Sequence, residues 1–195
     1  MTFINTNNTI TTKVLSLPEH PQETIEIRFR HATMEDLEKI ATLESLCFPK
    51  AEAASKESFS SRLKAYPNHF LLGETANEII CNINGLVTNE KDLKDEMYEN
   101  TSYHQEKGNW QMIFGVETHP SYQKLGLASF TMKHFIKQAQ EENRLGIVLT
   151  CKKELLPFYK RFGFIDEGVS SSEHGGVIWH QMRLFLSTCN ARICD

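Results

Sequence analysis

A turn over residues 123–129 has the residue types and the order that a phosphate-binding loop needs. An expected strand ends at Val116, His119 and Pro120 follow it, and the turn leads straight into a long amphipathic helix. A glycine and a small residue at a helix N-terminus let several backbone N–H groups point at one spot, and the helix dipole strengthens their attraction for an anion. Such a nest of N–H groups can bind a pyrophosphate without needing a net positive charge.

Other phosphate-binding loops fit this chain poorly. It contains neither G-x-x-x-x-G-K-[ST], typical of nucleoside triphosphatases, nor G-x-G-x-x-G, typical of dinucleotide-binding enzymes. Taken alone, the turn over residues 123–129 could also be a plain helix start with one glycine before it.

The elements that must position this turn follow from hydrophobic periodicity and capping residues. Helices are expected from Thr33, whose T-x-x-D pattern with Asp36 suggests a capping box, and from Ser55 up to Pro67. Further helices are expected near 91–97, from the turn to about 142, and over 155–161. Strands are expected near 25–29, 69–74, 78–87, 110–116, 146–150, 164–167 and 178–186. This order predicts a mixed α/β sheet with helices on both faces.

Composition indicates one globular domain. We expect residues 1–24 to be a peripheral or poorly ordered extension, 25–187 the domain, and 188–195 a tail. The net charge of −4 and the lack of a basic run disfavour nucleic-acid binding. Five scattered cysteines without a CxxC pair argue against a disulfide framework and a thiolate metal site. Since no signal peptide and no apolar run of roughly 20 residues is visible, we expect a cytoplasmic protein without metal or membrane contact.

Two motifs carry a resemblance to a known family. Q-x-x-G-x-A over residues 123–128, after V-x-x-H-P, resembles the coenzyme A pyrophosphate signature of the GNAT acetyltransferases, and Leu156–Phe164 resembles their later FYxxxGF element. The similarity extends over most of residues 25–186 and is closest to arylalkylamine N-acetyltransferases and their bacterial relatives. Three further stretches carry that finer likeness: 47–55, 148–159 and 170–176.

The resemblance implies a GNAT fold, a central and mostly antiparallel sheet whose strands 4 and 5 splay apart. It implies acetyl-coenzyme A as cosubstrate, with the pantetheine arm bonded to the backbone of Phe114, Gly115 and Val116, and an amide near Val116 polarising the thioester carbonyl. It also implies that the pyrophosphate is held by these residues: Gln123, Lys124, Leu125, Gly126, Leu127, Ala128 and Ser129. Tyr159 matches the tyrosine that protonates the departing thiolate, although a core aromatic is the alternative for it. Direct attack by an amine needs no acyl-enzyme, so Cys151 is expected to be a buried structural residue.

The base that removes the proton from the amine is left open by the sequence. Met112 and Phe114 stand where arylalkylamine N-acetyltransferases have two histidines, and neither can relay a proton. Glu52 is our first candidate and His174 the second. Glu96, His104 and Glu117, or a water chain that several of these groups touch, are the other possibilities.

The expected activity is acetylation of the primary amine of a small molecule, with the long acidic loop over residues 88–107 as a lid on the acceptor side. Acetylation of a protein or peptide amine is one alternative, and a non-catalytic acyl-coenzyme A sensor is another. The resemblance also makes a homodimer possible.

Overall fold

The structure is a computed structural model that describes residues 9–17 and 20–187. It divides into two compact units. The first unit takes in Met1–Asn84 and Val116–Thr131, and the second takes in Gly85–Gly115 and Met132–Asp195. The strands are β1 (Thr9–Leu17), β2 (His20–His31), β3 (Phe70–Glu74), β4 (Ile79–Asn84), β5 (Val87–Thr88), β6 (Trp110–Ile113), β7 (Gly115–Thr118), β8 (Gly146–Cys151), β9 (Ile165–Val169) and β10 (His180–Phe185). The α-helices are α1 (Leu37–Cys47), α2 (Lys56–Ala65), α3 (Leu127–Glu141) and α4 (Leu156–Lys160).

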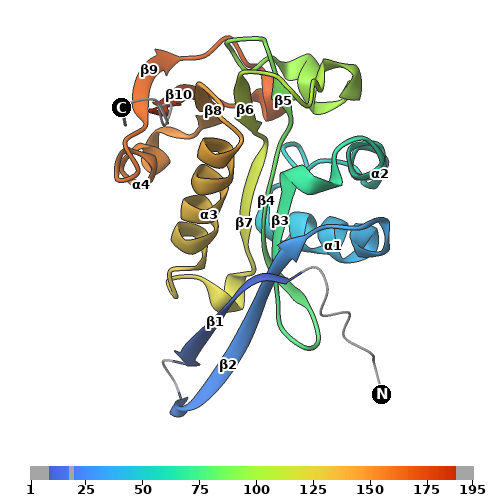
Figure 1. Cartoon of the computed structure of the whole chain (residues 1–195), viewed down its shortest axis with the longest axis vertical. Helices are drawn as coiled ribbons and strands as arrows, with labels where there is room; N and C mark the ends of the chain where they lie inside the picture. Colours follow the sequence, from blue (N-terminus) through green and yellow to red (C-terminus); the bar gives the residue numbers. More distant parts are fainter. Residues whose placement is uncertain (1–8, 18–19, 188–195) are drawn as a thin grey trace, which may run out of the picture. The chain divides into compact units, whose positions relative to one another are not determined.

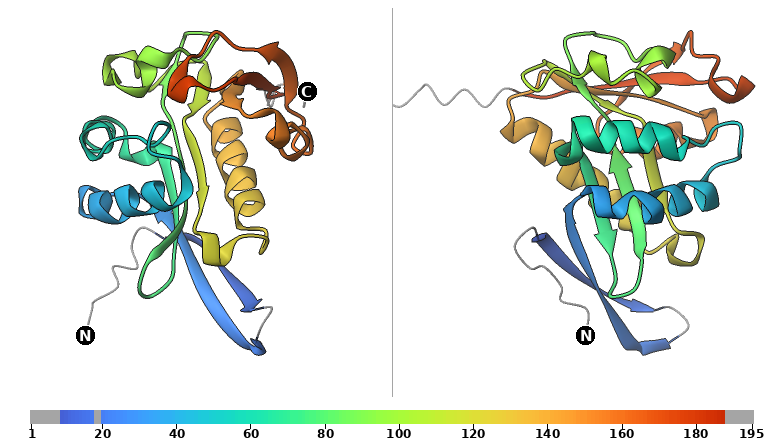
Figure 2. Two further views of the ribbon diagram at one scale, coloured as in Figure 1. Left: turned by 180° about the vertical axis from the view of Figure 1, so that it is seen from behind. Right: turned by 90° about the vertical axis from the view of Figure 1, so that its right-hand side faces the viewer.

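The first unit is built on a sheet of strand order β1-β2-β3-β4-β7, in which β1–β2, β2–β3 and β3–β4 pair in antiparallel fashion. Helices α1 and α2 lie next to each other on one side of β3 and β4 (Figures 1 and 2). Large apolar side chains from strands and helices fill the space between them, and the most deeply buried include Phe29, Ile40, Phe59, Phe70 and Leu72. Burial of such side chains supplies the main driving force for this unit.

The starts of the helices in this unit follow the capping residues. Thr33 and Asp36 form a reciprocal capping box before α1, through a short 3₁₀ turn over Met34–Asp36. The Ser55 side chain accepts a hydrogen bond of 3.0 Å from the Ser58 N–H and so caps α2. Helix α2 ends at Ala65, two residues before Pro67, which cannot continue it. These local expectations are confirmed.

Part of the segment 1–24, for which we expected a peripheral or poorly ordered extension, forms β-structure at the edge of the sheet. Thr9–Leu17 form the edge strand β1, and β2 begins at His20 instead of near Ile25. Alternation of Ile10, Thr12 and Val14 with less exposed neighbours is the pattern of a ribbon that shows one face to solvent. Only Arg28–His31 of β2 pair with β3, so the rest of the ribbon extends beyond that strand (Figure 1). Residues 1–8 and the tail 188–195 lie outside the described residues.

The second unit contains a sheet of strand order β5-β6-β8-β10-β9. Strands β6 and β8 pair in parallel, whereas β5–β6, β8–β10 and β9–β10 are antiparallel. The parallel ladder runs from Trp110–Gly146 to Ile113–Leu149 and ends there, although β8 continues to Cys151. The fully buried Ile147 and Val148 explain the uninterrupted apolar run of β8.

Four expected elements have different bounds. The expected strand 110–116 is two strands, β6 and β7, interrupted at Phe114, and the expected strand 78–87 stops at Asn84. At Gly85 a Cβ atom would lie only 1.8 Å from the Met112 carbonyl oxygen, so the backbones approach too closely for any side chain. The expected helix 91–97 is a 3₁₀ turn over Asp95–Tyr98, and the last strand begins at His180 and leaves Ile178 exposed. Within the described ranges, every helix is too short or too polar to cross a bilayer.

Candidate functional site

The turn before α3 contains two residues in the left-handed region of backbone conformation. A 3₁₀ turn over Pro120–Tyr122 precedes it, and Lys124 and Gly126 have φ angles of 64° and 78°. The Phe130 N–H donates to the Gly126 carbonyl over 3.0 Å, which is the first α-helical bond of α3. The amides of residues 127–129 therefore precede the first helical bond and are the N-terminal donors of the helix.

The surface at this turn is open. Gln123, Lys124 and Gly126 are exposed, and a Cβ atom placed on Gly126 would meet no atom of the described residues within 4 Å. The turn is held from its other side, since the Ser121 N–H donates to His119 Nδ1 (3.2 Å) and Gln123 Nε2 donates to the Thr118 carbonyl (3.4 Å). An anion at Gly126 would thus meet backbone instead of a side chain.

The strand that leads to the turn changes its partners at Phe114. Before this residue β6 pairs with β8, and after it β7 belongs to the sheet of β4. Gly115 is buried, whereas Phe114 and Val116 are half-buried. The backbone of residues 114–116 thus lies where the β6–β8 ladder has ended.

An aromatic cluster surrounds Phe114 in the second unit. The Tyr98 ring lies 4.9 Å from the Phe114 ring and is stacked at 4.9 Å on the ring of His174. The Tyr98 hydroxyl is 3.3 Å from Thr150 Oγ1, on the part of β8 beyond the ladder. The loop over residues 88–107 is joined to the segment before β10, because Asp95 accepts a hydrogen bond of 2.9 Å from the Glu173 N–H. His174 is therefore stacked on Tyr98, and a hydrogen bond joins the two loops that carry these rings.

Tyr159 is buried on α4, with 6% of its surface exposed, and packs against the rings of Phe158 and Phe164. Burial raises the pKa of its phenol, and the neighbouring Cys151 adds to the increase. The phenol is therefore protonated at neutral pH and able to donate. The same surroundings also fit a core aromatic residue.

Cys151 lies at the end of β8 and is 1% exposed. Burial raises the pKa of its thiol to about 12, and the nearby Asp166 and Glu154 contribute to this increase. A thiol that is protonated and inaccessible is a poor nucleophile. The position agrees with a structural role.

The expected bases lie in different surroundings. Glu52 is half-buried in the α1–α2 connection, where its N–H donates to the Pro49 carbonyl over 2.8 Å. His104 Nδ1 accepts a hydrogen bond of 3.2 Å from the Val87 N–H, and Glu96 is exposed. Met112 is fully buried in β6.

Glu117 is the base candidate whose surroundings differ most from expectation. It lies on β7 and is 1% exposed, with Glu44 of α1, itself 6% exposed, within hydrogen-bonding reach. Burial raises the pKa of Glu117 well above its usual value, and the charge of Glu44 raises it further. Glu117 cannot meet an amine directly. Sequence reasoning missed Glu44, although it follows Ile40 by four residues and so lies on the buried face of α1.

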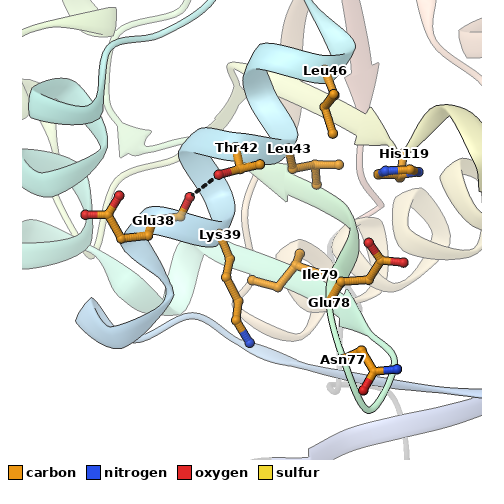
Figure 3. A pocket seen from close by; sticks show the side chains of 9 residues that line it. All are labelled: Glu38, Lys39, Thr42, Leu43, Leu46, Asn77, Glu78, Ile79 and His119. Atoms are coloured by element: carbon orange, nitrogen blue, oxygen red, sulfur yellow. Dashed lines mark hydrogen bonds between the residues drawn. The ribbon is translucent and has the colours of Figure 1, made fainter.

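A pocket of about 190 Å³ lies elsewhere in the first unit (Figure 3). Its charged lining is engaged within the protein, since Glu38 forms an ion pair with Lys56 and Glu78 accepts a hydrogen bond of 3.0 Å from the Tyr122 hydroxyl. Two carboxylates in the lining also make it unsuitable for a diphosphate. It contains none of the expected site residues. The lining consists of Glu38, Lys39, Thr42, Leu43, Leu46, Asn77, Glu78, Ile79 and His119.

Comparison with known proteins identifies similar chains and folds. An uncharacterized N-acetyltransferase, ycf52, of Porphyra purpurea is 33% identical over 70 residues, 35% of this chain and 37% of that protein. The chain thus matches little more than a third of the length of this curated relative. The loading GNATL domain of CurA from Lyngbya majuscula has a TM-score of 0.71 at 18% identity, covering 82% of this chain and 97% of that one. The GNAT-like decarboxylase GphF, in complex with isobutyryl-CoA, has a TM-score of 0.70 at 15% identity, covering 81% and 98%.

These two structures are too distant in sequence to show more than the fold, which is the mixed α/β fold of GNAT proteins, as expected. The family itself is shown by a model described as "Acetyltransferase (GNAT) domain", which matches residues 44–186 and so covers most of the sequence. The chain belongs to the GNAT acetyltransferase family.

Proposed function

We propose that this protein is an acetyl-coenzyme A-dependent N-acetyltransferase, which transfers an acetyl group to the primary amine of a small molecule. The amine attacks the thioester carbon directly, the C–S bond breaks, and coenzyme A departs as a thiolate that takes up a proton. Family membership and the similarity to an N-acetyltransferase support the reaction type. Neither separates a small-molecule acceptor from a peptide.

The observation that carries the proposal is the open turn before α3. Positive φ angles at Lys124 and Gly126 and the unoccupied space at Gly126 leave the helix N-terminal amides of residues 127–129 free to approach a diphosphate. Residues 123–129 would hold the pyrophosphate, and the backbone of residues 114–116 the pantetheine arm. The Val116 amide would stabilise the developing oxyanion.

Tyr159 is assigned the proton donor for the thiolate. Its raised pKa keeps the phenol protonated, so that it can donate a hydrogen bond to the leaving sulfur. Complete transfer to a thiolate with an ordinary pKa near 8.5 would be uphill. The phenol therefore serves first as a hydrogen-bond donor, and the proton moves as the thiolate becomes desolvated.

Glu52 remains the proposed base for the amine, and His174 the second choice. Glu52 lies in the α1–α2 connection with part of its side chain exposed, so a substrate can reach it. His174 is half-buried against Tyr98 and Trp179, and its ring is held in place by stacking. Action in the cytoplasm and as a homodimer stay predictions.

Substitution of Gly126 tests the coenzyme A site. In Gly126→Ala the new methyl group enters the space in front of the amides, and alanine is also strained at φ 78°. We expect coenzyme A to bind about tenfold more weakly or worse, a loss of about 1.4 kcal/mol or more, when measured by isothermal titration calorimetry.

Gly168→Ala is the matched control, because Gly168 also has a positive φ (94°) and open space around it, but lies in β9. It should cost similar stability and leave coenzyme A affinity unchanged. Wild-type protein that gives no binding heat with coenzyme A would contradict the proposal.

Thiol release with acetyl-coenzyme A and a panel of amines separates the functional classes. Turnover with small primary amines is expected. Turnover only with peptides would indicate that the acceptor is a protein or peptide amine. Binding of coenzyme A without turnover on any amine, peptide or antibiotic would indicate a non-catalytic acyl-coenzyme A sensor.

A further inference from the structure

Two glutamates of the first unit form a buried acid pair that the proposed reaction does not use. Glu44 is in the last turn of α1, and Glu117 is on β7. They are 6% and 1% exposed, and their side chains are within hydrogen-bonding reach of each other. Two ionised carboxylates in this position would repel each other strongly, since little water is present to screen them.

The surrounding hydrogen bonds satisfy only part of the Glu117 carboxyl group. Oε1 accepts from Asn82 Nδ2 over 2.8 Å and from Asn84 Nδ2 over 3.4 Å. Oε2 is enclosed, and among the described residues it meets no donor. Its neighbour Glu44 offers only acceptor oxygens while it is ionised. A proton between the two carboxyl groups would turn this contact into a hydrogen bond and leave neither oxygen unsatisfied.

The charges around the pair lead to the same conclusion. Arg62 of α2 is 3% exposed, its Nη1 donates to Asn84 Oδ1 over 3.4 Å, and its charge acts on Glu117. Two thiols among the described residues are also titratable neighbours. Burial and the charges of Glu117 and Glu44 raise the pKa of Cys47 to about 11, and burial and the charge of Glu117 raise the pKa of Cys81 to about 12, so both thiols stay neutral. One guanidinium balances one carboxylate. A second buried carboxylate would leave the cluster with an uncompensated charge, which is costly away from water.

Glu44 also holds the connection between α1 and α2. Its Oε1 accepts a hydrogen bond of 2.7 Å from the Ala54 N–H, one residue before the Ser55 cap of α2. The side chain of Glu44 thus lies between the α1–α2 connection and the strand that carries Glu117.

We propose that Glu44 and Glu117 share a single proton, and that this acid pair is a latch that fastens the α1–α2 connection to β7. When a base in solvent removes the proton, two carboxylates face each other and the cluster gains one negative charge. Repulsion then displaces Glu44, and the Ala54 N–H loses its acceptor. The latch is closed at low pH and opens as the pH rises. It does not depend on the proposed acetyl transfer.

Unfolding equilibria test the shared proton. Above about pH 5 an unfolded glutamate is ionised, whereas the native pair retains one proton up to its own raised pKa. Over that interval the unfolding constant of the wild type, measured in urea, should rise about tenfold per pH unit relative to Glu117→Gln. The glutamine keeps the shape and can donate to Glu44 without titrating. Glu35→Gln, at an exposed carboxyl of the same unit, should show a constant ratio to the wild type.

Infrared spectra of the wild type provide a test that does not depend on a variant folding. At pH 6 the spectrum should contain the band of one protonated, buried carboxyl group, and this band should disappear in Glu117→Gln and persist in Glu35→Gln. Hydrogen-exchange protection of the Ala54 amide should fall as the band is lost at higher pH. A wild type without the band, or a flat stability ratio between the wild type and Glu117→Gln, would overturn the proposal.

Discussion

At the scale of single residues, burial decides which side chains can take part in proton transfer. Glu117 and Cys151 are each 1% exposed, and burial raises the pKa of both groups, to about 12 for the Cys151 thiol. Tyr159 is also buried, but a phenol can donate a hydrogen bond in its neutral form, provided that the acceptor lies close to it. The same desolvation that disqualifies a nucleophile therefore suits a phenolic donor.

Replacement of Tyr159 tests this role. Tyr159→Phe should lower kcat by about 10-fold or more and leave the Kd for coenzyme A nearly unchanged, because the hydroxyl acts mainly on the departing thiolate. Since the pKa of the phenol is raised, the wild type should show no alkaline loss of activity from this group below pH 10. Steady-state kinetics with a thiol reagent, together with calorimetry, supplies both quantities.

A hydroxyl removed elsewhere serves as the control. Tyr103 lies in a 3₁₀ turn over Thr101–Tyr103, and Tyr103→Phe should keep wild-type kcat. If Tyr159→Phe turns over at the wild-type rate across pH, with chemistry shown to limit the rate, Tyr159 is a core aromatic residue.

At the scale of elements, a charged network fixes the start of α1 against the sheet. Arg30 donates two hydrogen bonds of 2.7 Å to Asp36, and the Thr33 N–H donates one of 2.8 Å to the same carboxylate. Burial alone would raise the pKa of Asp36, but these hydrogen bonds outweigh it and the pKa is lowered. Burial would also raise the pKa of Glu74 on β3, but hydrogen bonds and charges from Arg30 and Arg28 lower it.

Loss of the Asp36 charge should weaken the whole first unit. Asp36→Asn removes the bidentate partner of the half-buried Arg30 guanidinium, which keeps Glu74 as its other partner. We therefore expect a loss of about 2 kcal/mol in the free energy of unfolding. Because the native pKa lies below the unfolded value, this stability is present above pH 4 and disappears as the pH falls through the native pKa. Urea denaturation at pH 7 and pH 3 measures both effects.

The difference in the free energy of unfolding between the wild type and Asp36→Asn should be smaller at pH 3 than at pH 7. Glu35→Gln removes an adjacent exposed carboxylate and serves as the control. Its free energy of unfolding should stay within about 0.5 kcal/mol of the wild type at both pH values. An Asp36→Asn variant as stable as the wild type at pH 7 would mean that the network contributes no net stability.

Local sequence patterns predicted the starts of helices better than the interruption of strands. The caps at Thr33 and Ser55 depend on residues three positions away, so the sequence contains the whole cause. The break between β6 and β7 has no such signal, because Trp110–Ile113 are buried throughout and their run continues into Phe114. It arises where the partner strand changes from β8 to β4, and that choice depends on residues far away in the chain. The Glu44–Glu117 contact is likewise invisible without the fold.

At the scale of the whole molecule, charge bears on how the proposed cosubstrate is held. The chain has a net charge of −4, and coenzyme A is itself a polyanion. Long-range attraction therefore cannot supply the affinity, and short-range bonds from uncharged amides at the turn must do so. Lys124 is the one cation within residues 123–129, and its side chain is exposed.

Salt dependence distinguishes amides from lysine contacts. If backbone amides hold the diphosphate, raising ionic strength from about 0.05 to 0.5 M should change the Kd for coenzyme A by less than about threefold, because salt also screens the repulsion from the acidic protein. Lys124→Ala should then weaken binding only slightly at either salt concentration. A Kd that rises tenfold or more with salt, with the rise absent in Lys124→Ala, would show that a lysine–phosphate ion pair dominates. Calorimetric titrations of both proteins at both salt concentrations decide between these outcomes, since salt weakens an ion pair much more than it weakens hydrogen bonds from uncharged amides.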